Sequence, residues 1–192
     1  MTQPDDLIDA LEPVIKLFRE LGIQHFIGGS IASSYHGATR STMDVDVVCS
    51  MSMDQVSRFV SNLAGDYYVS LSAAQAAIRS KSCFNLIHLA TSFKVDVFVS
   101  RGRPSDVESM RRATLGKLGV TRTLEVPIAT AEDMIISKLE WFQLTGRTSE
   151  RQWNDVSRLL LFLGTTADVV YLRQVADSVG VRDLLEQALT QS

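Results

Sequence analysis

Residues 44 to 47 alternate acidic and apolar side chains, in the order Asp44, Val45, Asp46 and Val47, and Val48 follows them. A period of two is typical of a β-strand, because successive side chains on a strand point to opposite faces of the sheet. Asp44 and Asp46 therefore share one face. The pattern predicts a sheet that places two carboxylates side by side.

The remaining patterns predict a mixed α/β part followed by a helical part. We expect strands over 25–28, 45–49, 67–71, 84–90 and 93–99, with an edge strand over 120–126 that Pro127 closes. Helical spacing of apolar residues predicts helices over 7–22, 31–37, 53–63, 73–80, 131–144, 150–163, 168–179 and 181–190. The sequence thus predicts an α/β (α+β) fold, divided into a core over 1–127 and a C-terminal helical subdomain over 128–192 that packs on it.

Composition narrows the class of protein further. The chain has 19 Lys and Arg against 22 Asp and Glu, so its net charge of −3 gives no general attraction to nucleic acid or to an acidic membrane. The acidic start and the lack of a run of about 20 apolar residues predict a cytoplasmic protein with no membrane partner. The segment Arg101–Arg122 is the exception, with six basic and two acidic residues. It is explained either as a solvated surface or as a patch for nucleic-acid phosphates.

A glycine-rich turn, Gly28-Gly29-Ser30, lies between the first predicted strand and the next helix. Residues without a β-carbon let the chain turn sharply and let a ligand approach the backbone, and Ser30 adds a hydroxyl. Free N–H groups and the positive end of the helix dipole favour a phosphate there. Taken alone, the turn is more often a plain connection from strand to helix.

The acidic residues point to a metal. Asp44 and Asp46 repel each other unless a cation lies between them, and Mg²⁺ prefers carboxylate oxygens together with substrate phosphates. The alternative is a pair of solvated acids at a strand end. Asp96 lies inside the apolar segment 93–99, where an unpaired carboxylate is costly to bury, so a metal ligand or base facing a cleft explains it better than packing does. Phosphatases and glycosyltransferases also use an Asp-x-Asp pair, but theirs follows an apolar strand, whereas Asp44 opens one.

Together these residues resemble the DNA polymerase beta-type nucleotidyltransferase superfamily, whose signature is Gly-Gly/Ser after a strand, then Asp-x-Asp/Glu, then a distant Asp. The chain is most similar to small bacterial AbiEii-like nucleotidyltransferases, some of which are toxin components. The resemblance covers roughly residues 7 to 163. It is carried by Gly28-Gly29-Ser30, His36-Gly37, Arg40-x-Thr42, Asp44-Val45-Asp46-Val47, Phe84-Asn85-Leu86-Ile87-His88, Lys94-Val95-Asp96-Val97-Phe98, Ile136-Ser137-Lys138-Leu139-Glu140-Trp141 and Ser149-Glu150-Arg151-Gln152-Trp153-Asn154-Asp155.

The resemblance implies a nucleotidyltransferase-type mixed β-sheet flanked by helices, in which the first 127 residues form the catalytic core. It also implies two Mg²⁺ ions held by Asp44, Asp46 and Asp96, with Asp96 acting as ligand or general base beside the nucleophile. A nucleoside monophosphate would pass from a nucleoside triphosphate such as ATP to a hydroxyl of an acceptor, and pyrophosphate would leave. The implied nucleotide-binding residues are Gly28, Gly29, Ser30, Lys138 and Arg40.

Two of these residues keep alternative explanations. Lys138 lies against an apolar stripe of its helix, so its ammonium either reaches water or, as the resemblance favours, enters a cleft to neutralise triphosphate oxygens, with Asp155 as a candidate to orient it. Arg40 either contacts phosphate or forms a salt bridge with the acids.

The acceptor and the partners stay open at this stage. The acceptor is a tRNA 3′ end, bound through Arg101–Arg122, or a protein side chain, or a small molecule such as an aminoglycoside. A cognate toxin or antitoxin is a further expected partner. The alternatives to an enzyme are a non-catalytic nucleotide-binding or antitoxin-like protein of the same fold, and an unrelated α/β interaction domain. The complete set of acids favours the enzyme.

Overall fold

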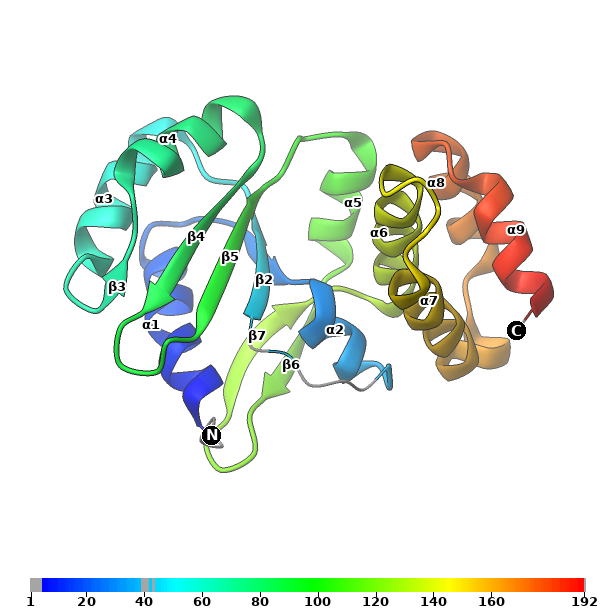
Figure 1. Cartoon of the computed structure of the whole chain (residues 1–192), viewed down its shortest axis with the longest axis horizontal. Helices are drawn as coiled ribbons and strands as arrows, with labels where there is room; N and C mark the ends of the chain where they lie inside the picture. The colour runs from blue at the N-terminus through cyan, green and yellow to red at the C-terminus, as the bar shows by residue number, and fades with distance from the viewer. Residues whose placement is uncertain (1–4, 39–41, 43, 192) are drawn as a thin grey trace.

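The computed structural model describes residues 5–38, 42 and 44–191. Within these residues, seven strands form one mixed sheet in the order β3-β4-β5-β2-β1-β7-β6 (Figure 1). The strands are β1 His25–Ile27, β2 Asp44–Cys49, β3 Tyr67–Tyr68, β4 Cys83–His88, β5 Lys94–Val99, β6 Thr114–Leu118 and β7 Leu124–Ile128. Strand β2 pairs parallel with β5 and antiparallel with β1. The two strands that carry the predicted acids are therefore neighbours in the middle of the sheet.

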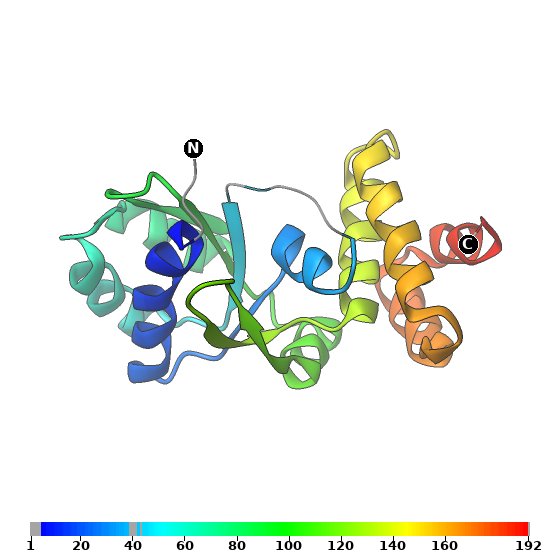
Figure 2. The same ribbon diagram turned by 90° about the horizontal axis from the view of Figure 1, so that it is seen from below.

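Helices surround this sheet and continue beyond it. They are α1 Asp6–Glu20, α2 Gly29–Tyr35, α3 Met53–Leu63, α4 Leu71–Ser80, α5 Pro104–Arg112, α6 Ala131–Leu144, α7 Glu150–Leu163, α8 Val169–Val179 and α9 Arg182–Gln191. Figure 2 shows α6 to α9 gathered at one end of the molecule and α1 toward the other. Across the described ranges, no helix has the length and apolar character to cross a membrane.

One face of the central strands packs into the hydrophobic core. Val45 and Val47 of β2 are fully buried. Helices α1 and α3 pack on this face, where Phe59 of α3 lies edge-on to Phe84 of β4 and stacks on Phe18 of α1 at 4.9 Å between ring centroids. Burying a large apolar side chain stabilises a fold by roughly 1.5–3 kcal/mol, so this face fixes the register of the strands. The acids are thereby turned to the opposite face.

A buried carboxylate joins the C-terminal helices to the sheet part. Asp133, near the start of α6, is 6% exposed. It accepts hydrogen bonds from the Ser109 hydroxyl of α5 at 2.9 Å and from the Tyr171 hydroxyl of α8 at 2.5 Å. The Arg112 guanidinium lies 3.4 Å from the same carboxylate and 3.8 Å from the centroid of the Tyr171 ring. This one side chain therefore holds α5, α6 and α8 together.

The predicted fold class is confirmed: a mixed sheet with flanking helices and a C-terminal helical region. Three helices, α3, α6 and α7, begin and end at the predicted residues. The strand predicted over 67–71 ends at Tyr68, because α4 already begins at Leu71.

The segment between residues 101 and 128 differs most from the prediction. Helix α5 and strand β6 lie where no element was predicted. The strand expected over 120–126 begins at Leu124, includes Pro127 and is not an edge strand, because β6 lies outside it. The sheet tolerates Pro127 since β7 pairs with β1 only at Ile128.

Candidate active site on strands β2 and β5

The structure brings the three predicted acids together on one face of the sheet. In the parallel pairing of β2 with β5, Asp46 is directly opposite Asp96, and Asp44 is opposite Lys94. Neighbouring strands lie about 4.8 Å apart, and residues in register share a face. Asn85 of β4 is in turn opposite Asp96. A polar row thus crosses the sheet at the level of Asp46.

Asp46 lies directly against the first turn of α2. A β-carbon added to Gly29 would lie 1.5 Å from the Asp46 Oδ2 atom, and Gly29 has a φ of +56°, which favours glycine. The backbone N–H of Ser30 donates a hydrogen bond to the Asp46 carboxylate. Gly28 has a φ of −115° and room for a side chain, so only Gly29 of the predicted pair is required by geometry. The anion at this helix start is the protein's own aspartate.

The surroundings of Asp46 disfavour its charge. Its pKa is raised from 3.8 to about 6, chiefly by burial and then by the negative charges of Asp44 and Asp96. The Ser30 N–H and the positive charge of Lys138 act in the opposite direction without cancelling the shift. Burial and the two neighbouring acids therefore favour the protonated form of Asp46.

Lys94 supplies part of the missing positive charge. Its Nζ atom lies 2.7 Å from Asp96 Oδ2 and 3.9 Å from Asp44 Oδ2. The hydrogen bond to Asp96 is the main reason that the Lys94 pKa is raised. This lysine was not predicted as a site residue. Its place two residues before Asp96 on the same strand is the signal that could have identified it.

The donor atoms at this face suit a magnesium ion in their chemistry. All are carboxylate oxygens, and the buried Oδ1 atom of Asp96 has no hydrogen-bond partner among the described residues. Within residues 5–38, 42 and 44–191, however, no three His, Cys, Asp or Glu side chains are already grouped closely enough to hold a metal. In this arrangement the Lys94 ammonium is the cation that contacts the acids.

Lys138 does not extend into water, which excludes one of its two predicted placements. It is 5% exposed, and its Nζ atom lies 2.7 Å from Asp155 Oδ2 of α7. Its charge still lowers the pKa of Asp46, so it acts on the same site from α6. Thr42 donates a hydrogen bond to the Asp44 carboxylate. The predicted residue Arg40 lies outside the described residues.

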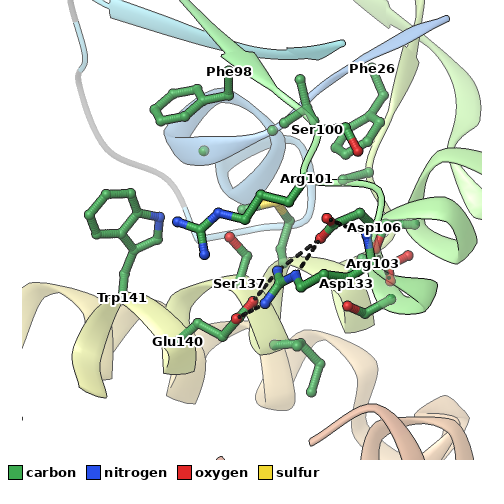
Figure 3. Close-up of a pocket in the computed structure, with 18 of the residues that line it drawn as sticks. Phe26, Phe98, Ser100, Arg101, Arg103, Asp106, Asp133, Ser137, Glu140 and Trp141 are labelled. Carbon is green, nitrogen blue, oxygen red and sulfur yellow. Dashed lines mark hydrogen bonds and ion pairs between the residues drawn. The ribbon is translucent and has the colours of Figure 1, made fainter. Parts of the chain in front are cut away.

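A cavity of about 210 Å³ lies beyond these acids along the strands, and its lining includes Gly29 but none of the three aspartates (Figure 3). Its lining includes Val48 and Phe98, which follow Asp46 and Asp96 by two residues on the same face. Gly28 and Gly29 line it on the α2 side, and Figure 3 shows α6 running along the other side. A ligand in the cavity would thus extend along the strands from the carboxylates.

The segment Arg101–Arg122 is not a continuous basic surface. Most of its cations form ion pairs: Arg103 with Asp106 and Glu140, Arg111 with Glu108, Arg112 with Glu132 and Asp133, and Arg122 with Asp9 and Glu12. The acidic partners from outside the segment belong to α1 and α6. Lys117 and Arg101 have no such ion pair among the described residues. Of the predicted phosphate-binding patch, only these two cations therefore lack an acidic partner in the described part of the chain.

Several solved structures share this architecture, and one of them is described as nucleotidyltransferase-like. An antigenic nucleotidyltransferase-like protein from Paracoccidioides brasiliensis is 16% identical, with a TM-score of 0.56 over 99% of this chain and 94% of that one. The antibiotic-resistance factor ANT(2'')-Ia in solution is 14% identical, with a TM-score of 0.56 over 99% and 100% of the two chains. The crystal structure of ANT(2'')-Ia with adenylyl-2''-tobramycin is 13% identical in sequence, with a TM-score of 0.57 over 90% of this chain and 97% of that one.

No protein-family model and no curated protein sequence matches the chain. The structural likeness at these low identities establishes the fold: the chain has the nucleotidyltransferase-like fold, with a seven-stranded mixed sheet in its described residues.

Proposed function

We propose that this chain is a Mg²⁺-dependent nucleotidyltransferase, which transfers a nucleoside monophosphate from a nucleoside triphosphate to an acceptor hydroxyl. The observation that carries the proposal is the position of Asp44, Asp46 and Asp96 on one face of β2 and β5, beside the turn at Gly29. The fold shared with ANT(2'')-Ia, whose crystal structure contains adenylyl-2''-tobramycin, supports it.

In this proposal each acid has a distinct task. Asp44 and Asp46 would hold Mg²⁺, and Asp96 would be a further ligand or the general base. Bound Mg²⁺ would stabilise the negative charge on the phosphate oxygens. The acceptor oxygen bonds to the α-phosphorus, the bond to pyrophosphate breaks, and the hydroxyl proton passes to Asp96. In the described part of the chain the buried Oδ1 atom of Asp96 accepts no hydrogen bond, whereas Oδ2 is paired with Lys94.

The nucleotide-binding residues of the proposal are Gly28, Gly29, Ser30, Lys138 and Arg40. Lys138 reaches this site from α6, which makes the helical part of the chain a contributor to the site. We accordingly propose residues 1–127 as the catalytic core and 128–192 as a helical subdomain that packs on it. The sequence resemblance to AbiEii-like proteins supports a toxin–antitoxin context for this activity.

Labelled nucleotide tests this function directly. Wild-type protein and an Asp44→Ala/Asp46→Ala variant are incubated with each α-³²P-labelled NTP and Mg²⁺, and separately with total tRNA, protein lysate and small hydroxyl compounds. Asp54→Ala, a change at an exposed acid on α3, is the matched control. We expect label to appear in one acceptor pool with the wild type and the control, and to be absent with the double variant. Equal label in all three samples would contradict the proposal.

A second candidate is a nucleotide-binding or antitoxin-like protein that does not turn over. The contact of the Lys94 ammonium with Asp96 and Asp44 favours it, because a permanent cation there would compete with magnesium. In the same experiment this candidate predicts that no acceptor is labelled, while equilibrium dialysis still detects binding of NTP to the protein.

A further inference from the structure

Arg101 is an unusual cation in this protein because it lines the cavity without forming an ion pair in the described part of the chain. It is exposed and belongs to the loop that follows β5. Figure 3 shows its side chain extended toward the Trp141 ring of α6. Lys81, at the end of α4, is a second exposed cation of the cavity lining for which the described residues provide no ion pair. An arginine with free donors in a cavity is suited to carboxylate or phosphate.

The carboxylates of the same cavity are already neutralised. Arg103 lies 2.8 Å from Asp106 and 2.6 Å from Glu140, and Figure 3 shows this cluster beside the cavity. Asp133 is held by Arg112 and by the Tyr171 hydroxyl. The charges left without a protein partner are therefore positive. A polycation such as an aminoglycoside would meet Arg101 and Lys81 with like charge, whereas an anion would be attracted.

The wall around Arg101 combines apolar surface with hydroxyl groups. Phe98 and Trp141 line the cavity together with Ser100 and Ser137. Trp141 is 47% exposed, so a ligand could cover part of its indole ring. Hydroxyl groups and a guanidinium beside aromatic rings are typical of sites that bind phosphorylated organic molecules.

The cavity continues the strand that carries Asp96. Phe98 and Val99 both line it, and the roughly 3.3 Å rise per residue places Val99 about 10 Å from Asp96 along β5. An acceptor whose hydroxyl lies at Asp96 can therefore place a distant charged group at Arg101. The triphosphate of the donor is assigned to the turn at Gly29, which lines the α2 side of the same cavity, so donor and acceptor would lie next to each other.

We propose that this cavity is the acceptor subsite and that the acceptor carries a phosphate group, which Arg101 binds with help from Lys81 while Trp141 covers its organic part. The proposal rests on the proposed transferase function. Two sources share this chemistry, a free mononucleotide and the backbone of an RNA, and the experiment separates them.

Trp141 can report binding without any turnover. The protein has two tryptophans, and Trp153→Phe leaves Trp141 as the only one. In this background, quenching of indole fluorescence is titrated with AMP, a short RNA and tobramycin, and binding of the donor analogue α,β-methylene-ATP with Mg²⁺ is measured by calorimetry. We expect AMP or the RNA to quench and tobramycin not to. If only the RNA quenches the fluorescence, the phosphate that Arg101 binds belongs to an RNA backbone. If AMP alone quenches it, the phosphate belongs to a free nucleotide.

Arg101→Met in the same background should weaken the binding of the phosphate ligand at least about tenfold, which corresponds to about 1.4 kcal/mol. Binding of the donor analogue, measured by calorimetry because this ligand lies away from Trp141, should stay nearly unchanged. Arg151→Met, at an exposed arginine of α7 outside the cavity lining, is the matched control and should change neither. An equal loss of affinity for the donor analogue would assign the cavity to the donor and overturn the proposal. Quenching by tobramycin alone would also overturn the proposal.

The Asp44→Ala/Asp46→Ala variant separates this inference from the proposed function. If the subsite is as proposed, this variant transfers no label but still binds the phosphate ligand in an Arg101-dependent way. Should the wild type transfer no label while Arg101-dependent quenching persists, the transferase function fails and the anion site stands. Absence of quenching by every phosphate ligand, with label still transferred, would refute the subsite alone.

Discussion

The Asp46 carboxylate occupies the space that a side chain at Gly29 would need, with Oδ2 only 1.5 Å from the position of the missing β-carbon. The left-handed backbone of Gly29 and the N–H of Ser30 position that carboxylate. The glycine of the turn and the second acid of the Asp-x-Asp pair, 17 positions apart in the sequence, are thus one structural unit.

The two glycines of this turn should respond differently to a methyl group. Gly29→Ala must move Asp46 and adopt a strained φ, so we expect a loss of about 1–3 kcal/mol in the free energy of unfolding, together with loss of label transfer. Gly28→Ala has space and an ordinary φ, and it should change stability by less than about 1 kcal/mol. Urea denaturation of both variants measures the difference. Equal effects would show that the contact with Asp46 is unimportant.

The raised pKa of Asp46 predicts a pH-dependent cost to stability. A carboxyl group with a pKa raised from 3.8 to about 6 binds its proton more tightly in the folded chain than in the unfolded chain. Its contribution therefore falls as the pH rises between these values and is fully unfavourable above the higher one.

Asp46→Asn keeps the shape and removes this titration. We expect the variant to be more stable than the wild type near pH 8 by up to about 3 kcal/mol, and to lose the advantage near pH 4. Denaturation without Mg²⁺ at both pH values gives the comparison. A stability difference independent of pH would rule out the titration of Asp46 as its cause.

The ion pair between Lys138 and Asp155 is buried on both sides, at 6% and 5% side-chain exposure. Removing one partner leaves an uncompensated charge, so we expect Asp155→Leu to lower the free energy of unfolding by roughly 3–5 kcal/mol. The double variant Lys138→Met/Asp155→Leu should recover a large part of this loss. Additive losses in the double-variant cycle would contradict a direct interaction between the two residues.

The Tyr171 hydroxyl is expected to stabilise the attachment of α8. It donates a hydrogen bond to Asp133, and burial together with that carboxylate raises the pKa of Tyr171. Tyr171→Phe should lower the free energy of unfolding by roughly 1.5–3 kcal/mol, because the bond involves a charged acceptor. Tyr68→Phe, at a tyrosine that is 67% exposed, should have almost no effect. Calorimetry or urea denaturation compares the two variants.

The sequence predicted most helices because their apolar residues recur with the helical period. Helix α5 was not predicted, because none of its residues that the structure describes is buried and it therefore has no apolar stripe. It is held instead by polar contacts, such as those of Arg103 with Glu140 and of Ser109 with Asp133. Such contacts depend on residues of α6 that only the folded chain brings near.

The candidate site was predicted in part for a similar reason. The period of two in β2 placed Asp44 and Asp46 on one face, and the position of Asp96 inside an apolar segment identified it as the third candidate. The register between β2 and β5, which brings Asp96 opposite Asp46, is a long-range property that no local pattern contains. The ion pairs of Arg122 with Asp9 and Glu12 of α1 could not be predicted from the sequence for the same reason.

Lys94 gives the central sheet its own counter-ion. Because this ammonium contacts the buried Asp96, strand β5 can settle beside β2 without a cation from solution. We therefore expect a newly made chain to complete its fold whatever the concentration of free magnesium around it. The proposed magnesium ion would then act at ligand binding rather than in assembly.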